Sequence, residues 1–401
     1  MRSSALALLS SLAFVTGSAL AASVTPHDCA APGRWVVADQ TAPVPPMGWS
    51  ALAGQDVVLL GEQHDSAAHH RWQLATLTAL HALRPTLVIG LEMLPREAQP
   101  ALDDWVAGKL SESAFLRRSG WYRYWGLDAD LYLPILHFAR ERALPLVALN
   151  VTPERRDRLV EAFLGRASGE DPASGVEGEF GAIPAPRQPG QRYRERLATS
   201  FHEHAPDDIG DAALDEFIAA QLIWDVAMAD ALARRLGETQ GNGQTRRPLA
   251  VAIMGRGHVE YGDGVAHQLQ TLGIPQVATL LPVAAEEACR ADPTLATALF
   301  VVAPEPGEKT ATPKLGVAVE TTAEGLKVTH VAAGSPAQQA GLRVDDILTR
   351  VAERALTQPA ELAALMARVL PGSRLPLVIL RDGQRQALEA ALPLGEALES
   401  D

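Results

Sequence analysis

The stretch Val57-Val58-Leu59-Leu60-Gly61-Glu62-Gln63-His64 joins an unbroken apolar run to a polar turn. Four apolar residues in succession are typical of a short strand buried on both faces, as in a parallel sheet. In open parallel sheets, ligands bind just outside the carboxyl ends of the strands. This one stretch therefore predicts a fold class and also the place in that fold where a site would form.

Four further apolar runs of the same kind follow along the chain, at 87–91, 146–149, 249–254 and 277–281. Stretches with a helical spacing of apolar residues lie between them, at about 67–83, 97–108, 130–143, 211–238 and 262–272. Alternating strands and helices predict an α/β domain, with a mainly parallel sheet flanked by helices and joined by right-handed crossovers.

The length and composition are those of a globular protein with more than one domain. The chain has 401 residues, of which 47% are hydrophobic and 21% charged, and its formal net charge is −13. Nucleic acids and anionic membranes attract proteins with basic patches. We therefore expect no nucleic acid and no anionic membrane as the main partner.

Residues 1–22 have the three parts of a secretory signal peptide: a cationic start, a short apolar core and the ending Ala19-Leu20-Ala21-Ala22. A membrane anchor is the alternative, but the apolar run is short for a span. No cysteine stands at the cleavage point to carry a lipid. We therefore expect an exported, soluble protein, which in a Gram-negative cell means the periplasm.

The two cysteines, Cys29 and Cys289, lie far apart in the sequence. In an oxidising compartment they could form one disulfide that closes a very long loop, and two unpaired thiols are the alternative. The sequence leaves both outcomes open, because a disulfide requires the two residues to meet in space.

Two breaks in the pattern divide the chain. Residues 165–192 are rich in Gly, Pro, Ser and Glu, which indicates a long insert, and a short helix is expected at about 193–204. Residues 304–313 have the composition of an inter-domain linker. We therefore expect a first domain over 23–303 and a second, small β-rich domain over 314–395.

Polar side chains follow the predicted strands at their carboxyl ends. Glu62 and His64 follow the first strand, Glu92 ends the second, and His258 follows the fourth. Both histidines stand in a G-x-x-H turn, where the glycine permits a sharp turn and a close approach of the backbone. We expect these four side chains to converge on one edge of the sheet.

Carboxylates and imidazoles gathered in this way suit three kinds of chemistry. They bind a divalent metal, act as general acid and base, or hydrogen-bond the polar groups of a cofactor. The alternative is that each residue only caps a helix or supports a neighbour. On the long helix at 211–238, Gln221 and Asp225 interrupt an apolar stripe, so Asp225 would either hold a basic residue or shape the floor of the site.

Aromatic residues are few, at 5%, yet they cluster at Trp121-Tyr122-Arg123-Tyr124-Trp125. Such a cluster suits either the wall of a site for a flat ligand or ordinary core packing. Tyr193, beside the insert, and His202, on the helix that follows, are further candidate site residues. Tyr132 and Tyr261 are the other two of the five tyrosines.

Together these motifs resemble the ChaN family of haem-binding uptake proteins, within the wider Tiki, TraB and erythromycin-esterase-like superfamily. The resemblance covers about residues 45–285. The matching motifs are Val-Val-Leu-Leu-Gly-Glu-Gln-His (57–64), Gly-Leu-Glu-Met (90–93), Tyr-Trp-Gly (124–126) with Tyr-Leu-Pro-Ile (132–135), Ala-Leu-Asn (148–150), Gln-Leu-Ile-Trp-Asp-Val-Ala-Met-Ala (221–229) and Gly-Arg-Gly-His-Val (255–259).

The resemblance implies an α/β domain that binds haem during haem or iron acquisition, as a dimer that holds haem pairs with a tyrosine on each iron. Ferric iron favours such a phenolate oxygen. Tyr193 is the first candidate for this ligand, because it borders the insert, and Tyr132 is the second. Asp225, His202 and the four strand-end residues would then surround the haem, with histidine and basic side chains near its propionates. The lipobox of the family's lipoproteins is missing here, so the usual signal for membrane tethering is absent from the sequence.

The wider superfamily also contains hydrolases, including metal-dependent proteases and an esterase, with similar G-x-x-H turns and a similar strand-end glutamate. A metal-dependent hydrolase is therefore the alternative function. His64, His258 and Glu92 would then hold a divalent metal, and Glu62 or Glu92 would be the base for a water. A non-catalytic scaffold is a third interpretation.

The C-terminal region resembles a PDZ domain of the type found in periplasmic proteases. Lys314-Leu315-Gly316-Val317 is similar to the loop that binds a peptide carboxylate, and Gly334–Leu342 and Asp345–Leu348 are similar to the turn, helix and strand that follow. In such domains Leu315, Gly316 and Val317 would offer backbone N–H groups to a chain end, and a helix at about 359–370 would be the other wall of the groove. A PDZ fold kept only for packing is the alternative.

Overall fold

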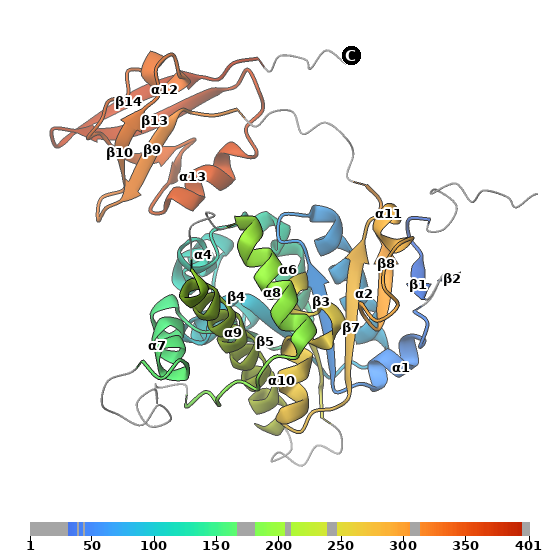
Figure 1. Ribbon diagram of the computed structural model, residues 1–401. Coiled ribbons are helices and arrows are strands. Elements are labelled where there is room, and N and C mark those ends of the chain that lie inside the picture. Colours follow the sequence, from blue (N-terminus) through green and yellow to red (C-terminus); the bar gives the residue numbers. More distant parts are fainter. Residues whose placement is uncertain are drawn as a thin grey trace, which may run out of the picture.

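The computed structural model describes residues 31–37, 40–42, 45–166, 181–204, 210–238, 247–304 and 313–394. Within these ranges the chain forms two domains, each built on its own sheet (Figure 1). The first is an α/β domain and the second is a small antiparallel β domain, as predicted. The predicted signal peptide and most of the predicted linker lie outside the described residues.

The large sheet has eight strands in the order β2-β1-β8-β7-β3-β6-β4-β5. Neighbours from β8 to β5 pair in parallel, whereas β1 and β2 pair antiparallel at one edge. The five predicted strands are β3 (Val57–Glu62), β4 (Leu87–Pro95), β5 (Leu146–Asn150), β6 (Leu249–Gly255) and β7 (Val277–Val283). Three further strands were not predicted, because runs this short carry no clear period: β1 (Trp35–Val37), β2 (Gln40–Ala42) and β8 (Ala298–Val301).

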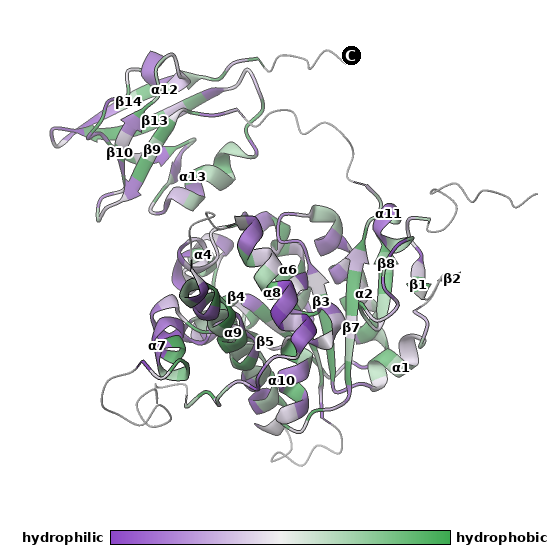
Figure 2. Ribbon diagram, viewed as in Figure 1, coloured by the Kyte–Doolittle hydropathy of each residue, from purple (hydrophilic) through white to green (hydrophobic). Residues whose placement is uncertain are grey.

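Helices cover both faces of this sheet. The described helices of the first domain are α1 (Trp49–Gly54), α2 (Ala67–Leu83), α3 (Gln99–Val106), α4 (Glu112–Ser119), α5 (Trp121–Tyr124), α6 (Leu133–Glu141), α7 (Pro153–Phe163), α8 (Gln191–His204), α9 (Asp211–Glu238), α10 (Val265–Thr271) and α11 (Ala285–Ala288). Helices α1, α2, α3 and α6 share a core with one face of the strands, and α9 and α10 share a second core with the other face. Helices α7 and α8 pack against the outer side of α9, and α8 shows mostly hydrophilic residues (Figure 2).

In β3 and β6 the residues alternate between these two cores although every one of them is buried. In β3, Val58 and Leu60 belong to the core with α2, whereas Val57 and Leu59 belong to the core with α9 and α10. Strands that bury both faces need apolar residues at every position, which explains the unbroken runs in the sequence.

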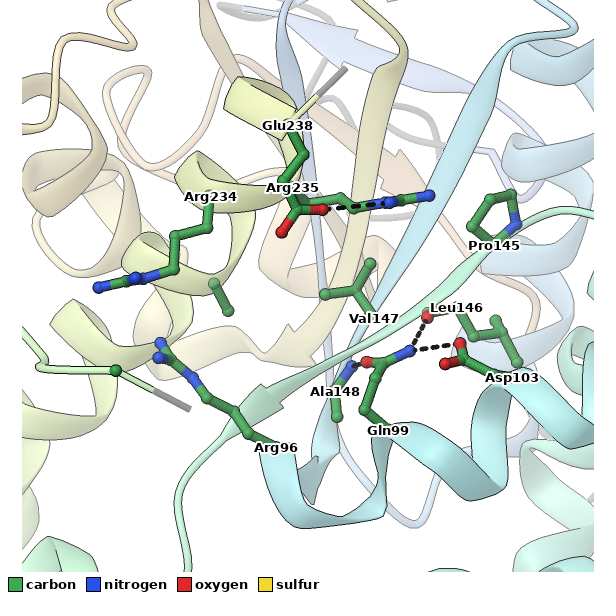
Figure 3. Close-up of a pocket in the computed structure, with 12 residues that line it drawn as sticks. Arg96, Gln99, Asp103, Pro145, Leu146, Val147, Ala148, Arg234, Arg235 and Glu238 are labelled. Carbon is green, nitrogen blue, oxygen red and sulfur yellow. Dashed lines mark hydrogen bonds and ion pairs between the residues drawn. The ribbon is translucent and has the colours of Figure 1, made fainter. Parts of the chain in front are cut away.

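The edge strand β5 is closed by a side chain. The Gln99 amide donates to the carbonyl oxygen of Leu146 (2.8 Å), and its own oxygen accepts from the N–H of Ala148 (2.9 Å). Figure 3 shows both bonds. A ninth strand beside β5 would pair with the same two backbone groups. The Gln99 side chain therefore blocks the edge at its centre.

The second sheet has the order β14-β13-β11-β10-β9, and β12 pairs with β11. Its elements are β9 (Val317–Thr321), β10 (Leu326–Val331), α12 (Pro336–Gln339), β11 (Ile347–Val351), β12 (Arg354–Ala355), α13 (Pro359–Met366), β13 (Arg374–Arg381) and β14 (Gln384–Ala391). The helix predicted at about 359–370 is α13, which ends at Met366. Strand β9 lies at the edge of its sheet, and α13 contacts it.

One cysteine can be followed in the structure. Cys289 is disulfide-bonded, while Cys29 lies outside the described residues. In the part of the chain that the structure describes, no helix has both the length and the apolar character needed to cross a membrane.

The close packing of β3 gives a prediction. A Cβ atom on Gly61 would lie 2.3 Å from Cδ2 of the buried Leu281 and 3.3 Å from the Arg256 Cα. We expect Gly61→Ala to lower the free energy of unfolding by about 1–3 kcal/mol through overpacking, measured by urea denaturation. Gly54→Ala is the matched control, because a Cβ there meets no atom within 4 Å. Equal stability of the two variants would contradict this explanation.

Candidate functional site

The four predicted rim residues lie together at the carboxyl ends of the strands. Glu62 ends β3, Glu92 lies in β4, and His258 follows β6 in a short 3₁₀ turn. Glu62, Glu92 and His258 are buried, whereas the His64 side chain is 40% exposed. The structure therefore places one accessible imidazole above a set of buried charged groups.

The first cluster surrounds the Glu62 carboxylate. Tyr132 donates its hydroxyl to Oε1 (2.6 Å), His64 Nδ1 lies 2.9 Å from the same oxygen, and the Gln73 amide donates to Oε2 (2.9 Å). His70 Nδ1 lies 3.3 Å from Oε2. Burial alone would raise the pKa of Glu62, but these hydrogen bonds and imidazole charges outweigh burial and hold the pKa below its usual value. Glu62 is therefore an ionised carboxylate inside the protein.

The second cluster surrounds His258. Its Nδ1 lies 2.7 Å from Asp225 Oδ1 on α9, and its Nε2 lies 3.5 Å from Glu92 Oε1. Tyr193 on α8 donates its hydroxyl to the other Asp225 oxygen (2.6 Å). Burial opposes the charge on His258, yet Asp225 and Glu92 outweigh burial and raise its pKa to about 9. His258 is therefore an imidazolium between two carboxylates at neutral pH.

The two clusters meet at Gly255. A Cβ on this residue would lie 2.8 Å from His64 Cε1 and 3.7 Å from Glu92 Oε2, and its N–H donates to Glu92 Oε2 (2.5 Å). Neither Gly61 nor Gly255 has a positive φ. Their common function in the G-x-x-H turns is therefore close approach rather than an unusual turn conformation.

This arrangement belongs to a known kind of protein. Residues 48–269, more than half of the chain, match the family described as haem-binding uptake, Tiki superfamily, ChaN. The chain belongs to the ChaN family. Residues 313–392 match the PDZ domain family. Both predicted resemblances are therefore confirmed.

Several solved structures are similar to parts of the chain, and the ChaN structure among them agrees with this assignment for the fold. A structure described as cofacial heme binding to ChaN of Campylobacter jejuni is 15% identical, with a TM-score of 0.50, and the match covers 68% of this chain and 98% of that one. A serine endoprotease from Yersinia pestis is 33% identical over 20% of this chain and 29% of that chain, with a TM-score of 0.19. The HtrA3 PDZ domain with a phage-derived ligand is 24% identical over 20% of this chain and 84% of that chain, also at 0.19.

In this ChaN-family domain, the two tyrosines proposed from the sequence are both buried. Tyr132 and Tyr193 are each 1% exposed, and each donates its hydroxyl to a buried carboxylate. Burial and the adjacent carboxylate raise the pKa of both phenols well above the usual value. Both hydroxyls therefore hold their protons in the described conformation.

A third tyrosine lies in a different setting. Tyr261 is half-buried, and its backbone has a φ of +58°, which is uncommon for a residue with a side chain. The guanidinium groups of Arg192 and Arg196 lie 4.4 and 5.1 Å from its ring centre. Tyr261 and Arg196 also line an open hollow of about 640 Å³. The G-x-x-H-x-x-Y order of 255–261 was the available signal in the sequence.

The predicted His202 is not part of either cluster. It is exposed near the end of α8, about 13 Å along the helix axis from Tyr193 at the usual rise per residue. Its ring contacts Phe201, with the ring centres 5.5 Å apart.

Several site residues were not predicted. His70 and Gln73 face Glu62 from α2, and their three-residue spacing on a helix next to the G-x-x-H turn was the signal. Trp125, from the aromatic cluster, packs edge-on against His64, with the ring centres 4.6 Å apart. The cluster therefore contributes to the core through the fully buried Trp121, and the wall of a ligand site stays a prediction.

The metal-ligand set of the alternative function lacks a matching arrangement. Among the described residues, no group of three or more His, Cys, Asp and Glu side chains is placed to hold a metal ion. His64, His258 and Glu92 as metal ligands stay a prediction from the sequence.

In the PDZ domain, the three residues predicted to bind a peptide carboxylate lie just before β9 and at its start. Gly316 has a φ of +83°, and a Cβ there would lie 2.3 Å from the Ser335 Cβ. The Leu315 side chain is buried in the core, so this residue can offer only its backbone to a ligand. Val317 begins the edge strand β9, whose free side is open to an added strand.

The raised pKa of His258 gives a prediction about stability. A group with a pKa of about 9 in the folded protein and about 6.5 when unfolded stabilises the fold fully below pH 6.5, and this contribution is lost as the pH rises through 9. We expect the free energy of unfolding to fall across this range by up to about 1.4 kcal/mol per pH unit. Urea denaturation at several pH values measures it.

Asp225→Asn removes the charge that holds the imidazolium, so we expect this fall to become much smaller. Asp215→Asn, an exposed change on the same helix, is the matched control and should keep the wild-type profile. A profile that Asp225→Asn leaves unchanged would show that His258 is not the titrating group.

Proposed function

We propose that this protein is an exported haem-binding protein that acts in haem or iron uptake or handling, and that its PDZ domain binds a peptide or protein chain end. The membership of residues 48–269 in the ChaN family carries this proposal. The phenols and imidazoles at the rim of the sheet support it, because tyrosine and histidine are axial ligands of haem iron.

The donor set fits a haem. Ferric iron takes a phenolate as axial ligand, and Tyr193 and Tyr132 each place a phenol oxygen among the rim residues. We keep Tyr193 as the first candidate and Tyr132 as the second. Each phenol already donates a hydrogen bond to a carboxylate, Tyr193 to Asp225 and Tyr132 to Glu62. If the phenol loses its proton to bind iron, that carboxylate is the nearest group that could accept the proton. A bound haem would supply its iron as the centre that holds this oxygen.

The surroundings suit the rest of a haem. Trp125 and the partly exposed His64 provide aromatic surface beside the rim. Arg192 and Arg196 flank Tyr261 and are cations of the kind that pairs with propionates. In the structure they pair with Asp263 and Glu260, which a propionate would have to displace. Because Tyr261 is more accessible than the other two candidates, it belongs in any test of the ligand.

A haem titration of single tyrosine variants tests this assignment. We expect wild-type protein to bind ferric haem with the Soret and charge-transfer bands of a tyrosine complex. Tyr193→Phe should lose these bands and bind at least tenfold more weakly, because the phenolate is gone. Tyr132→Phe and Tyr261→Phe test the other candidates. Tyr124→Phe is the control, because Tyr124 contacts neither Glu62 nor His258 in the hydrogen bonds of the two clusters.

If none of the three variants alters the spectrum, Tyr193, Tyr132 and Tyr261 are each ruled out as the ligand. If wild-type protein binds no haem at all, the proposed function itself is wrong. Sedimentation of the haem-loaded and haem-free protein tests the homodimer, which we propose because of the family.

The PDZ proposal has its own test. Strand β9 and the loop at Gly316 are placed to bind a free chain end, so the peptide carboxylate should decide affinity. We expect a peptide ending in an apolar residue, selected by display on the full protein, to bind at least tenfold more weakly when its C-terminus is amidated. Fluorescence anisotropy measures this, and equal binding of both forms would overturn a carboxylate-binding loop.

One observation favours the alternative, a metal-dependent hydrolase. His64 is partly exposed, and its Nδ1 lies 2.9 Å from the buried Glu62 carboxylate, an arrangement that suits a proton shuttle beside a Glu62 base. Metal analysis of the purified protein, followed by Glu62→Gln in any activity detected, tests it. Retained activity in that variant would exclude Glu62 as the base.

A further inference from the structure

A pocket of about 360 Å³ lies where the second domain meets the first. The first domain lines it with the turn at 97–98 and with α4 and α5, and the second domain with Thr357, Gln358 and Glu361 at the start of α13. The described residues that line it include none of the rim residues, the three candidate tyrosine ligands or the three predicted PDZ residues. The proposed function therefore does not explain this pocket.

Helix α13 contacts the first domain near both of its ends. Near its start, a Cβ on Gly126 would lie 3.8 Å from the Ala360 Cβ, an ordinary van der Waals contact. Beyond its end, the Arg368 guanidinium pairs with both oxygens of Asp128 and with Asp130 (2.7 Å). Figure 1 shows α13 on the side of the second domain that faces the first. These contacts place the start of α13 beside α5.

In the proposed peptide groove, α13 and β9 are the two walls. A carboxylate held at Gly316, just before β9, fixes the direction of a bound peptide, because its last residue then lies at the start of β9. The peptide runs antiparallel to the five residues of β9, and its upstream part passes Thr321. The Thr321 hydroxyl donates to Gln358 Oε1 (3.4 Å), and Gln358 lines the pocket. The pocket therefore lies where a bound peptide leaves the groove.

Three arginines and two carboxylates line this pocket. Arg118 pairs with Asp104 (2.6 Å), and Arg123 lies 3.8 Å from Glu154. Arg117 is exposed, and among the described residues no carboxylate pairs with it. Arg117 is therefore the cation that a ligand can meet without displacing a partner.

The two lining carboxylates have other neighbours. Glu361 caps α13, because one of its oxygens accepts the N–H groups of Gln358 and of the residue before it. Glu97 lies close enough to Arg155 to favour the charge of that guanidinium. A peptide segment that enters the pocket with carboxylate side chains would therefore find one free guanidinium, at Arg117.

We propose that the first domain extends the peptide groove of the PDZ domain and selects chain ends that carry acidic residues upstream. This inference rests on the proposed peptide binding and names the chemistry of the partner. The last five residues of the peptide pair with β9, one for each of its residues, and aspartate or glutamate farther upstream pairs with Arg117. A guanidinium suits such a carboxylate, because its N–H groups can donate two parallel hydrogen bonds.

Fluorescence anisotropy on the full-length protein tests the extended groove. The display-selected peptide of the PDZ test is made with its last five residues unchanged and with either three aspartates or three lysines directly before them. We expect the aspartate peptide to bind at least threefold more tightly at low ionic strength, and the difference to shrink at high salt, because exposed ion pairs are weak and screened.

Arg117→Glu should abolish or reverse this preference, because the free cation becomes an anion. Arg142→Glu is the matched control and should keep the preference. Arg142 is an exposed arginine at the end of another helix of the same domain, outside the pocket, and no described carboxylate pairs with it. A peptide of the last five residues alone should bind wild-type protein and both variants equally, which shows that the groove itself is intact.

Equal binding of the aspartate and lysine peptides by wild-type protein would overturn the extended groove, and so would an unchanged preference in Arg117→Glu. If the five-residue peptide still needs its free carboxylate in that case, the PDZ proposal stands and only the extension fails. If no peptide binds, or if amidated peptides bind equally well, both proposals are wrong.

Discussion

Asp225 has no exposed surface, and its two oxygens are shared between an imidazolium and a phenol. A buried carboxylate is costly unless it is fully paired, so its partners cannot move independently. Through this one group, the turn after β6 and helix α8 are both tied to α9. Glu62 likewise ties β3 to α2 and to the segment that carries Tyr132. The rim of the sheet is therefore a connected network rather than a set of separate side chains.

Much of this could be derived from the sequence because parallel strands leave a plain pattern. Unbroken apolar runs predicted the positions of β3 to β7. Because the carboxyl ends of parallel strands lie at one edge of the sheet, the residues that follow them were predicted to lie together: Glu62, His64, Glu92 and His258. The interruption of the apolar stripe by Asp225 correctly marked a buried carboxylate that needs a partner.

The remaining features depend on tertiary contacts that no local pattern records. The position of Tyr193 beside the insert suggested an accessible ligand, yet its hydroxyl is packed against Asp225. The pairing of His70 with Glu62 depends on how α2 crosses β3. The short strands β2, β1 and β8, at one end of the sheet, are set by pairing with strands that already exist, so three or four residues suffice.

The Gln99 amide at the edge of β5 also affects how folded molecules can associate with one another. An open parallel sheet of hydrophobic strands is a template for any extended chain, including a second copy of itself. The Gln99 side chain binds two backbone groups at the centre of that edge, so a strand from a neighbouring molecule cannot pair with them. This hinders the repeated edge-to-edge pairing that leads to aggregates. The fold thus carries its own protection against fibril growth at the cost of a single polar residue.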